Sequence, residues 1–344
     1  MIVFYEVMNS SKLDCLLFFV QNKITPHQLC ESIGYHVFHP IRVVGTFTAD
    51  IIHPYMKEQE IDALILLLDD TDSEVYMHVQ QKLISCGPGI IPRLESFTEQ
   101  QLDKTVLTKI SHIIKSIQFD EVCKRLAIWK KTDQQDILEP YLAISSYFET
   151  GLDEQKVKQA LDKLKKAIWL EMNYNLTPLE EVNVFNHVFY SLQGFGANNQ
   201  NLFDVNNNYI GNLLHSRKGN PISLGLLYLI VGRSLDMPVC GVNLPQHFIL
   251  SYHTQQLEGT ENEYEMRKSI LFYINCLNKG IIFTRDDITL FLKRINIEAE
   301  TRYYVPCSNA QIIELLLNSI LQSFELTNES DAAKIVMHFK SLIQ

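Results

Sequence analysis

The chain has 344 residues, and 46% of them are hydrophobic and 20% charged, which is enough apolar side chain to bury a core and excludes intrinsic disorder as the main state. The formal net charge is −10, from 30 Lys plus Arg against 40 Asp plus Glu. Because proteins that wrap nucleic acid need a basic face to displace counterions, we expect no nucleic-acid partner.

Residues 1–55 differ from the rest of the chain. Charges are sparse there, histidines are frequent, and neither a helical nor a strand period persists. Helical order begins just after Met56, so the simplest interpretation is that Met56 is the true start and that residues 1–55 come from a miscalled start codon. The alternative is a small N-terminal appendage with a function of its own.

Residues 56–120 have the pattern of paired amphipathic helices. Ile61, Leu64, Ile65 and Leu68 recur at the spacing of one helical face, and a second helix over 75–83 ends at a Gly-Pro-Gly turn. The segment LLLDDTDSEV at 66–75 resembles a HEAT repeat. One repeat is too short to form a solenoid, so we expect this HEAT-like region to pack on the part of the chain that follows it.

The rest of the chain alternates between helical patterns and one region of different composition. Residues 194–208 are rich in Gly and Asn and predict turns. A strongly apolar helix is expected next, followed by short strands and then by a helical C-terminus. The expected helices lie at 102–117, 121–131, 137–148, 154–169, 180–192, 221–235 and 312–324, and the expected strands at 239–242, 247–252 and 270–274.

Three short segments are the most specific part of the sequence. They read NYIGNLL at 208–214, RKGNPISL at 217–224 and GVNLPQHF at 241–248. Their order resembles the transglutaminase-like core of the bacterial SirB family, which carries an Arg-Arg-x-Gly-x-Pro-Ile-Ser/Thr-Leu block followed by a Pro-Gly-His-Phe block. The resemblance covers roughly 135–295, so we expect a core domain at 121–295 and a TPR-like helical tail at 296–344.

That resemblance implies an α+β fold that is predominantly helical. Its centre would be a papain- or transglutaminase-like core, with one helix packed on a small antiparallel sheet and helical repeats on both flanks. In active members a cysteine opens the helix, and a histidine and an aspartate come from neighbouring strands. The helix N-terminus lowers the thiol pKa, the imidazole takes its proton, and the carboxylate orients the imidazole.

The candidate catalytic residues match that pattern only in part. The cysteine position falls on Pro221, with Ser223 two residues later, and no cysteine lies between 124 and 239. His247 matches the family histidine, and Asn275 stands where the carboxylate is expected. The resemblance therefore keeps the histidine and lacks the nucleophile.

Two interpretations of Ser223 remain open. It could attack a substrate with His247 as base and Asn275 as orienting group, as papain-like proteases use an Asn. The favoured interpretation is that Ser223 caps or lines the first turn of a buried helix. Cys240 and Cys276 are weaker nucleophile candidates, since small buried thiols are common.

We therefore carry two functional hypotheses. The first is a non-catalytic transglutaminase-like protein that serves as a protein-binding, scaffold or regulatory module with a vestigial cleft around His247. The alternative is an amide-bond hydrolase or acyl-transferase with a papain-like Ser/Cys-His-Asn site. We expect no cofactor, because no phosphate-binding loop is present, and no metal, because His247 and His253 are six residues apart on one strand.

The cysteines indicate the compartment. There are seven, an odd number, and no two have CxxC spacing. This pattern predicts reduced thiols in a cytoplasmic protein, with neither a disulfide framework nor a zinc site. No apolar run is long enough for a membrane span, so we expect no membrane partner.

Overall fold

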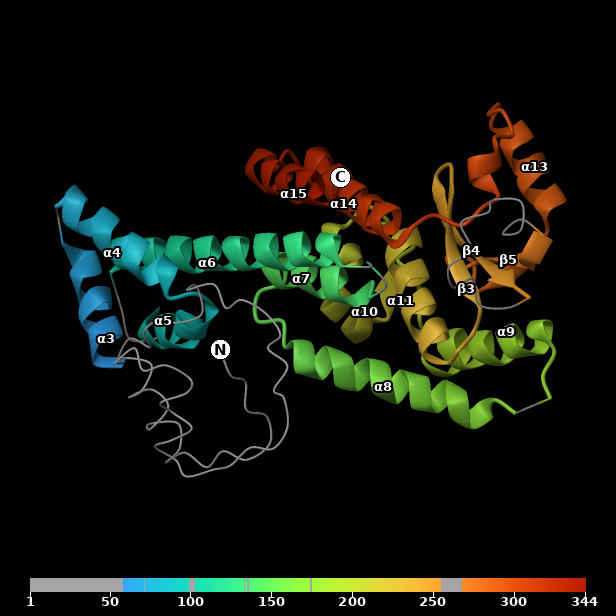
Figure 1. Ribbon diagram of the computed structural model, residues 1–344, viewed down its shortest axis with the longest axis horizontal. Coiled ribbons are helices and arrows are strands. Elements are labelled where there is room, and N and C mark those ends of the chain that lie inside the picture. Colours follow the sequence, from blue (N-terminus) through green and yellow to red (C-terminus); the bar gives the residue numbers. More distant parts are fainter. Residues whose placement is uncertain are drawn as a thin grey trace, which may run out of the picture. The chain divides into compact units, whose positions relative to one another are not determined.

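The computed structural model describes residues 58–344 except 71, 99–102, 133, 135, 174 and 255–267 (Figure 1). The prediction that residues 1–55 precede the true start concerns residues outside this range. The described chain is mostly helical and contains one small antiparallel sheet, so the expected α+β, predominantly helical class is confirmed.

From residue 58 onward, where the description begins, three α-helices precede one long helix. They are α3 (Glu58–Leu66), α4 (Ser73–Ser85) and α5 (Ile91–Thr98), and α4 and α5 contact the long helix α6 (Lys104–Lys131). Sequence patterns predicted two helices where α6 is continuous. Buried residues follow one face of α6 from Val106 to Trp129 with no Gly or Pro to end it. The expected boundary between 120 and 121 thus falls inside a helix, and the HEAT-like assignment stays a prediction.

The middle of the chain adds α7 (Leu138–Phe148), α8 (Glu154–Glu171), and α9 (Pro178–Asn186), which continues as a π-helical turn to Leu192. The Asn-rich region predicted as turns is followed by a short helix, α10 (Ile210–Ser216). Strand β1 (Gly196–Ala197) lies before the Asn-rich run and α10, and β2 (Lys218–Gly219) lies after them. The two strands pair in parallel, so backbone hydrogen bonds join the two ends of this region.

The apolar helix α11 (Pro221–Ser234) lies at the centre of the core. Its sequence is hydrophobic on all sides, which is typical of a helix enclosed by other elements. Leu224, Leu227 and Tyr228 are fully buried. Proline at its first position fits a helix start, because that N–H has no intrahelical acceptor.

The main sheet has the order β3-β4-β5-β6 and is antiparallel throughout. Its strands are β3 (Val239–Leu244), β4 (His247–His253), β5 (Ile270–Asn275) and β6 (Ile281–Phe283). Helix α11 packs on one face, and α13 (Arg285–Arg294) contributes to the core on the other. Sequence patterns predicted β3, β4 and β5 but neither β6 nor α13.

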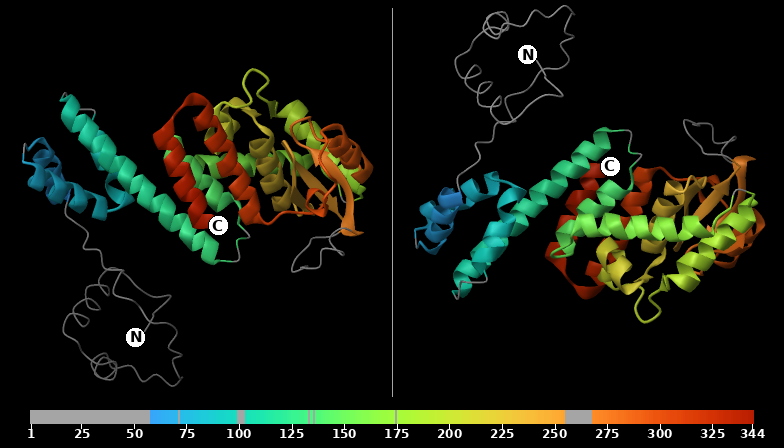
Figure 2. Two further views of the ribbon diagram at one scale, coloured as in Figure 1. Left: turned by 90° about the horizontal axis from the view of Figure 1, so that it is seen from above. Right: turned by 90° about the horizontal axis from the view of Figure 1, so that it is seen from below.

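The C-terminal part is a pair of helices, α14 (Asn309–Thr327) and α15 (Ser330–Ile343), joined by a short turn. The two contact each other, and α14 also contacts α11 while α15 contacts α6 (Figure 2). The TPR-like assignment of residues 296–344 stays a prediction. Among the described residues, no helix combines the length and the apolar character that crossing a bilayer requires.

Candidate functional site

The N-terminus of α11 is where the resemblance places the nucleophile. Asn220 is the N-cap, and its Oδ1 accepts a hydrogen bond from the Ser223 backbone N–H at 3.0 Å. In return, the Ser223 Oγ accepts from the Asn220 N–H at 3.1 Å, which completes a capping box. Ser223 has no exposed surface. Its hydroxyl therefore occupies a structural position at the helix start.

Further asparagines fill the space around this capping box. The Asn220 Nδ2 donates to Asn208 Oδ1 at 2.7 Å and to Ser319 Oγ at 3.1 Å, and Asn208 is fully buried. Asn207, also buried, donates to the carbonyl of Asn201 at 2.7 Å. We call Asn207, Asn208, Asn220 and Ser223 the asparagine cluster. In the sequence, two of these residues belong to the Asn run at 206–208. That run predicted turns and did not predict buried side-chain hydrogen bonds.

His247 lies on the other face of the sheet from α11. Alternate residues of a strand point to opposite faces. Phe248 belongs to the core that contains α11, and a Cβ on Gly225 of α11 would overlap the Phe248 ring. Ile249 instead packs with Ile288 of α13. His247 shares the Ile249 side, and its ring contacts Phe291 of α13 with centroids 5.2 Å apart.

His247 and Asn275 line one pocket of about 380 Å³ between the sheet and α13. The His247 Nδ1 is buried without a hydrogen-bond partner. Burial lowers the pKa of the His247 imidazole, so the ring is neutral near pH 7. The Asn275 Oδ1 accepts from the Asn278 N–H at 3.1 Å. The structure thus brings His247 and Asn275 together and leaves Ser223 on the opposite face.

Among the residues that the structure describes, the lining of this pocket contains no hydroxyl or thiol nucleophile. Seven of its ten residues are aliphatic or aromatic, and the polar ones are His247, Asn275 and Asp287. The Asp287 carboxylate accepts from the Thr284 N–H at 2.8 Å and from its hydroxyl at 2.7 Å, and these bonds lower the pKa of Asp287. An imidazole beside an amide can exchange a proton, but nothing in the lining offers a Ser or Cys for acyl transfer.

The described cysteines do not supply the missing nucleophile. Cys276 is fully buried in the α11 core, and burial raises its pKa. Burial also raises the pKa of Cys240, and it raises that of Cys307 to about 11. A reactive cysteine needs the opposite shift, because the thiolate is the nucleophile. Neither Cys240 nor Cys276 lines the pocket of His247.

His253 is a buried structural histidine. Its Nε2 shares a hydrogen bond with Ser251 Oγ, and its Nδ1 shares one with Ser269 Oγ, each at 2.8 Å. Burial lowers the pKa of His253 to about 4, so the ring is neutral in the folded protein. Within the described part of the chain, no three His, Cys, Asp or Glu residues are grouped as metal ligands would be.

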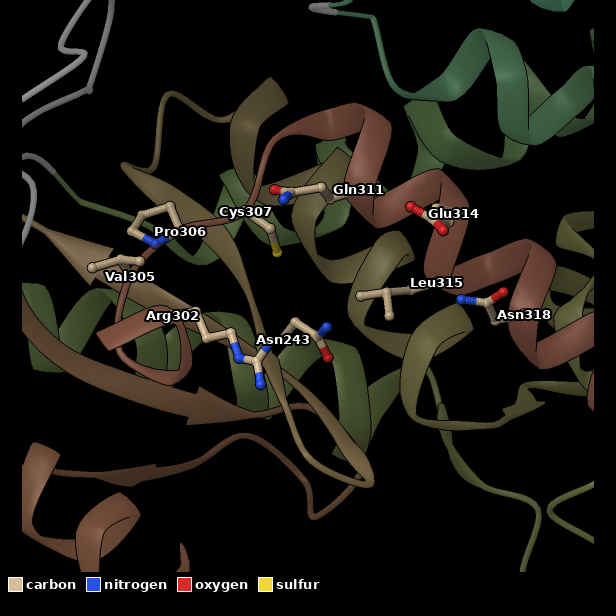
Figure 3. Close-up of a pocket in the computed structure, with 9 residues that line it drawn as sticks. All are labelled: Asn243, Arg302, Val305, Pro306, Cys307, Gln311, Glu314, Leu315 and Asn318. Carbon is tan, nitrogen blue, oxygen red and sulfur yellow. The ribbon is translucent and has the colours of Figure 1, made fainter. Parts of the chain in front are cut away.

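A second pocket, of about 340 Å³, lies between β3, residues 305–307 and α14 (Figure 3). Asn243 and Arg302 point into it, and Gln311, Glu314 and Asn318 of α14 form another wall. Sequence reasoning missed this pocket because its residues come from segments without a shared motif.

Comparison with known proteins agrees with this architecture. Residues 155–318 match the family model of the transglutaminase-like superfamily. The match includes α11, the sheet, α13 and the first half of α14. This chain therefore contains a domain of the transglutaminase-like superfamily.

Curated relatives fall into two groups. A UPF0162 protein of Vibrio cholerae is 31% identical over 121 residues, which are 35% of this chain and 44% of that protein. A UPF0162 protein of Xylella fastidiosa is 36% identical over 76 residues, 22% of this chain and 27% of that protein. Human F-box only protein 21 is 26% identical over 170 residues, 49% of this chain and 26% of that protein.

The chain spans less than half the length of these relatives. No solved structure matches it.

Proposed function

We propose that this protein is a non-catalytic, transglutaminase-like binding module that acts as a scaffold or regulatory partner of other proteins. The observation that carries the proposal is the separation of Ser223 from His247. Ser223 forms the hydrogen bonds of the α11 capping box, whereas His247 lies on the other face of the sheet, beside α13. A nucleophile and a base must be within hydrogen-bond reach to act together.

The pocket beside His247 supports a binding function for the domain, and the cysteines support a location. The pocket beside His247 is large enough for a small apolar group. The described cysteines are free thiols, which supports a reducing compartment, and we place the protein in the cytosol on that basis.

The alternative function is an amide-bond hydrolase or acyl-transferase. The observation in its favour is that His247 and Asn275 line one pocket, as the base and orienting amide of a papain-like site would. This alternative requires a nucleophile that reaches His247 from outside the described lining.

A turnover assay separates the two functions. The full chain is incubated with a blocked glutaminyl peptide, with and without a primary amine, and ammonia release and amine incorporation are measured. We expect neither to exceed the buffer blank. Turnover that disappears in Ser223→Ala or His247→Ala, with an unchanged melting temperature, would establish the enzyme instead.

Covalent labelling gives an independent readout that does not depend on choosing the right substrate. A fluorophosphonate and iodoacetamide are each applied to the native chain, and adducts are mapped by mass spectrometry. The proposal predicts no fluorophosphonate adduct at Ser223, because its hydroxyl is buried. An adduct at Ser223 in the folded protein would contradict the proposal.

A further inference from the structure

The pocket beside His247 opens next to an unpaired strand edge. Strand β6 is the last strand of the sheet and, among the described residues, pairs with β5 alone. Its Ile281, Ile282 and Phe283 all line the pocket. An edge strand presents backbone N–H and C=O groups that another chain can pair with.

The pocket selects an uncharged apolar group. Its walls include Ile249, Ile288 and Phe291, and the Asp287 carboxylate is already committed to the Thr284 cap. His247 and Asn275 are neutral polar groups at one side of it. An anionic side chain placed here would lose its hydration beside the like-charged Asp287 carboxylate, and the seven apolar lining residues match an apolar side chain better than a cationic one.

The edge and the pocket together favour an extended peptide over a helix. A strand added to β6 would direct alternate side chains toward the two faces of the sheet, and one face leads to the pocket. A docked helix has its backbone groups already paired and would leave the β6 edge unused. Ile281 is 53% exposed at this edge, so an incoming chain would also cover an apolar side chain.

We propose that the outer edge of β6 and the pocket beside His247 form one docking groove for an extended segment of a partner protein, which inserts a bulky aliphatic or aromatic side chain between the sheet and α13. This inference rests on the proposed binding function and specifies the surface and the chemistry of the partner. The peptide backbone pairs with β6, and the inserted side chain contacts Ile249, Phe283 and Phe291, which all belong to the α13 side of the sheet.

A display experiment tests this groove. Random linear peptides of about twelve residues, long enough to pair as a strand, are selected on the full chain and depleted on a His247→Trp variant that fills the pocket. Affinities of the enriched peptides are then measured by fluorescence anisotropy. We expect Ile281→Lys and His247→Trp to weaken binding roughly tenfold or more. Leu290→Lys is the matched control, because Leu290 is 54% exposed on α13 and does not line the pocket.

N-methylation of single peptide bonds then tests strand pairing. We expect loss of affinity only at the position whose N–H faces the three-residue strand β6 and not at its two neighbours, because only every second residue of an added strand bonds to β6. The groove is overturned if no peptide is enriched, if Leu290→Lys weakens binding as much as Ile281→Lys, or if N-methylation has no alternating effect. Peptides that bind all three variants equally would overturn the groove and leave the binding function standing, whereas turnover in the assays above would overturn the binding function itself.

Discussion

The two faces of the four-stranded sheet use their polar groups differently. On the α11 side, at the start of that helix, Asn208, Asn220 and Ser223 are buried and bond to one another and to Ser319, and the buried Asn207 bonds to backbone carbonyls. On the α13 face, the His247 Nδ1 is buried without a partner and the neighbouring pocket is open. Because buried polar groups stabilise a fold only when they are paired, the asparagine cluster serves stability and the pocket beside His247 is available for a ligand.

The largest expected effect is on the α11 face, where Asn220→Ala removes the N-cap. It also leaves the buried Asn208 Oδ1 without its donor. We expect a loss of about 2–4 kcal/mol in the free energy of unfolding, measured by urea denaturation, from the lost cap and the unpaired polar group.

A second capping box provides the control for Asn220. Thr284 caps α13 with the same pair of bonds, but these are exposed to solvent. Thr284→Ala should therefore destabilise the protein by only about 1 kcal/mol. Equal losses for the two substitutions would mean that the asparagine cluster adds nothing beyond an ordinary cap.

Acid should destabilise the protein through His253. Its pKa is lowered to about 4 in the folded state, against an ordinary value near 6.5, so the unfolded chain binds the proton more tightly. Stability is fully present above pH 6.5 and falls as the pH drops toward 4, by up to about 3 kcal/mol from this residue. His247, whose pKa is also lowered, contributes in the same direction.

Urea denaturation at several pH values measures this loss, with His253→Gln as the comparison. The variant keeps a neutral polar side chain at the site and should show a shallower decline between pH 6.5 and 4. Identical pH profiles for the wild type and the variant would show that His253 does not resist protonation in the fold.

A smaller effect tests which way β4 faces. Gly225→Ala would place a methyl group against the Phe248 ring, and overpacking of this kind destabilises by about 1–3 kcal/mol. Gly89 is the control, because a Cβ there meets nothing within 4 Å. If thermal denaturation finds Gly225→Ala as mild as Gly89→Ala, then Phe248 does not pack on α11 and the assigned face of His247 is wrong.

The central helix and three strands could be predicted because their signals are local. The Asn-Pro start and the apolar run fix α11, and β-branched and aromatic residues mark β3, β4 and β5. Strand β6 has only three residues, and α13 buries only Ile288 and Leu292 among its charged residues, so neither has a strong pattern of its own. Strand β6 pairs with β5 and α13 packs on the sheet, so tertiary contacts stabilise both elements.

The candidate site also combines features that the local sequence predicts with features that depend on tertiary structure. Motif order proposed His247 and Asn275 as candidate site residues; both line one pocket, and their catalytic role stays a prediction. The face of His247 could not be predicted, because β4 reads HFILSYH and is buried on both sides, so apolar alternation does not distinguish its faces. The role of Asn208 was also hidden, since its partner Asn220 lies twelve residues away across a helix and a strand.

A double-mutant cycle between Ser223 and His247 tests the central claim most directly. Ser223→Ala, His247→Leu and the double variant are unfolded in urea beside the wild type, and the interaction energy is calculated from the four free energies. Because the two side chains lie on opposite faces of the sheet, we predict that their effects add to within about 0.5 kcal/mol. A coupling of about 1 kcal/mol or more would place Ser223 and His247 in contact and contradict this account.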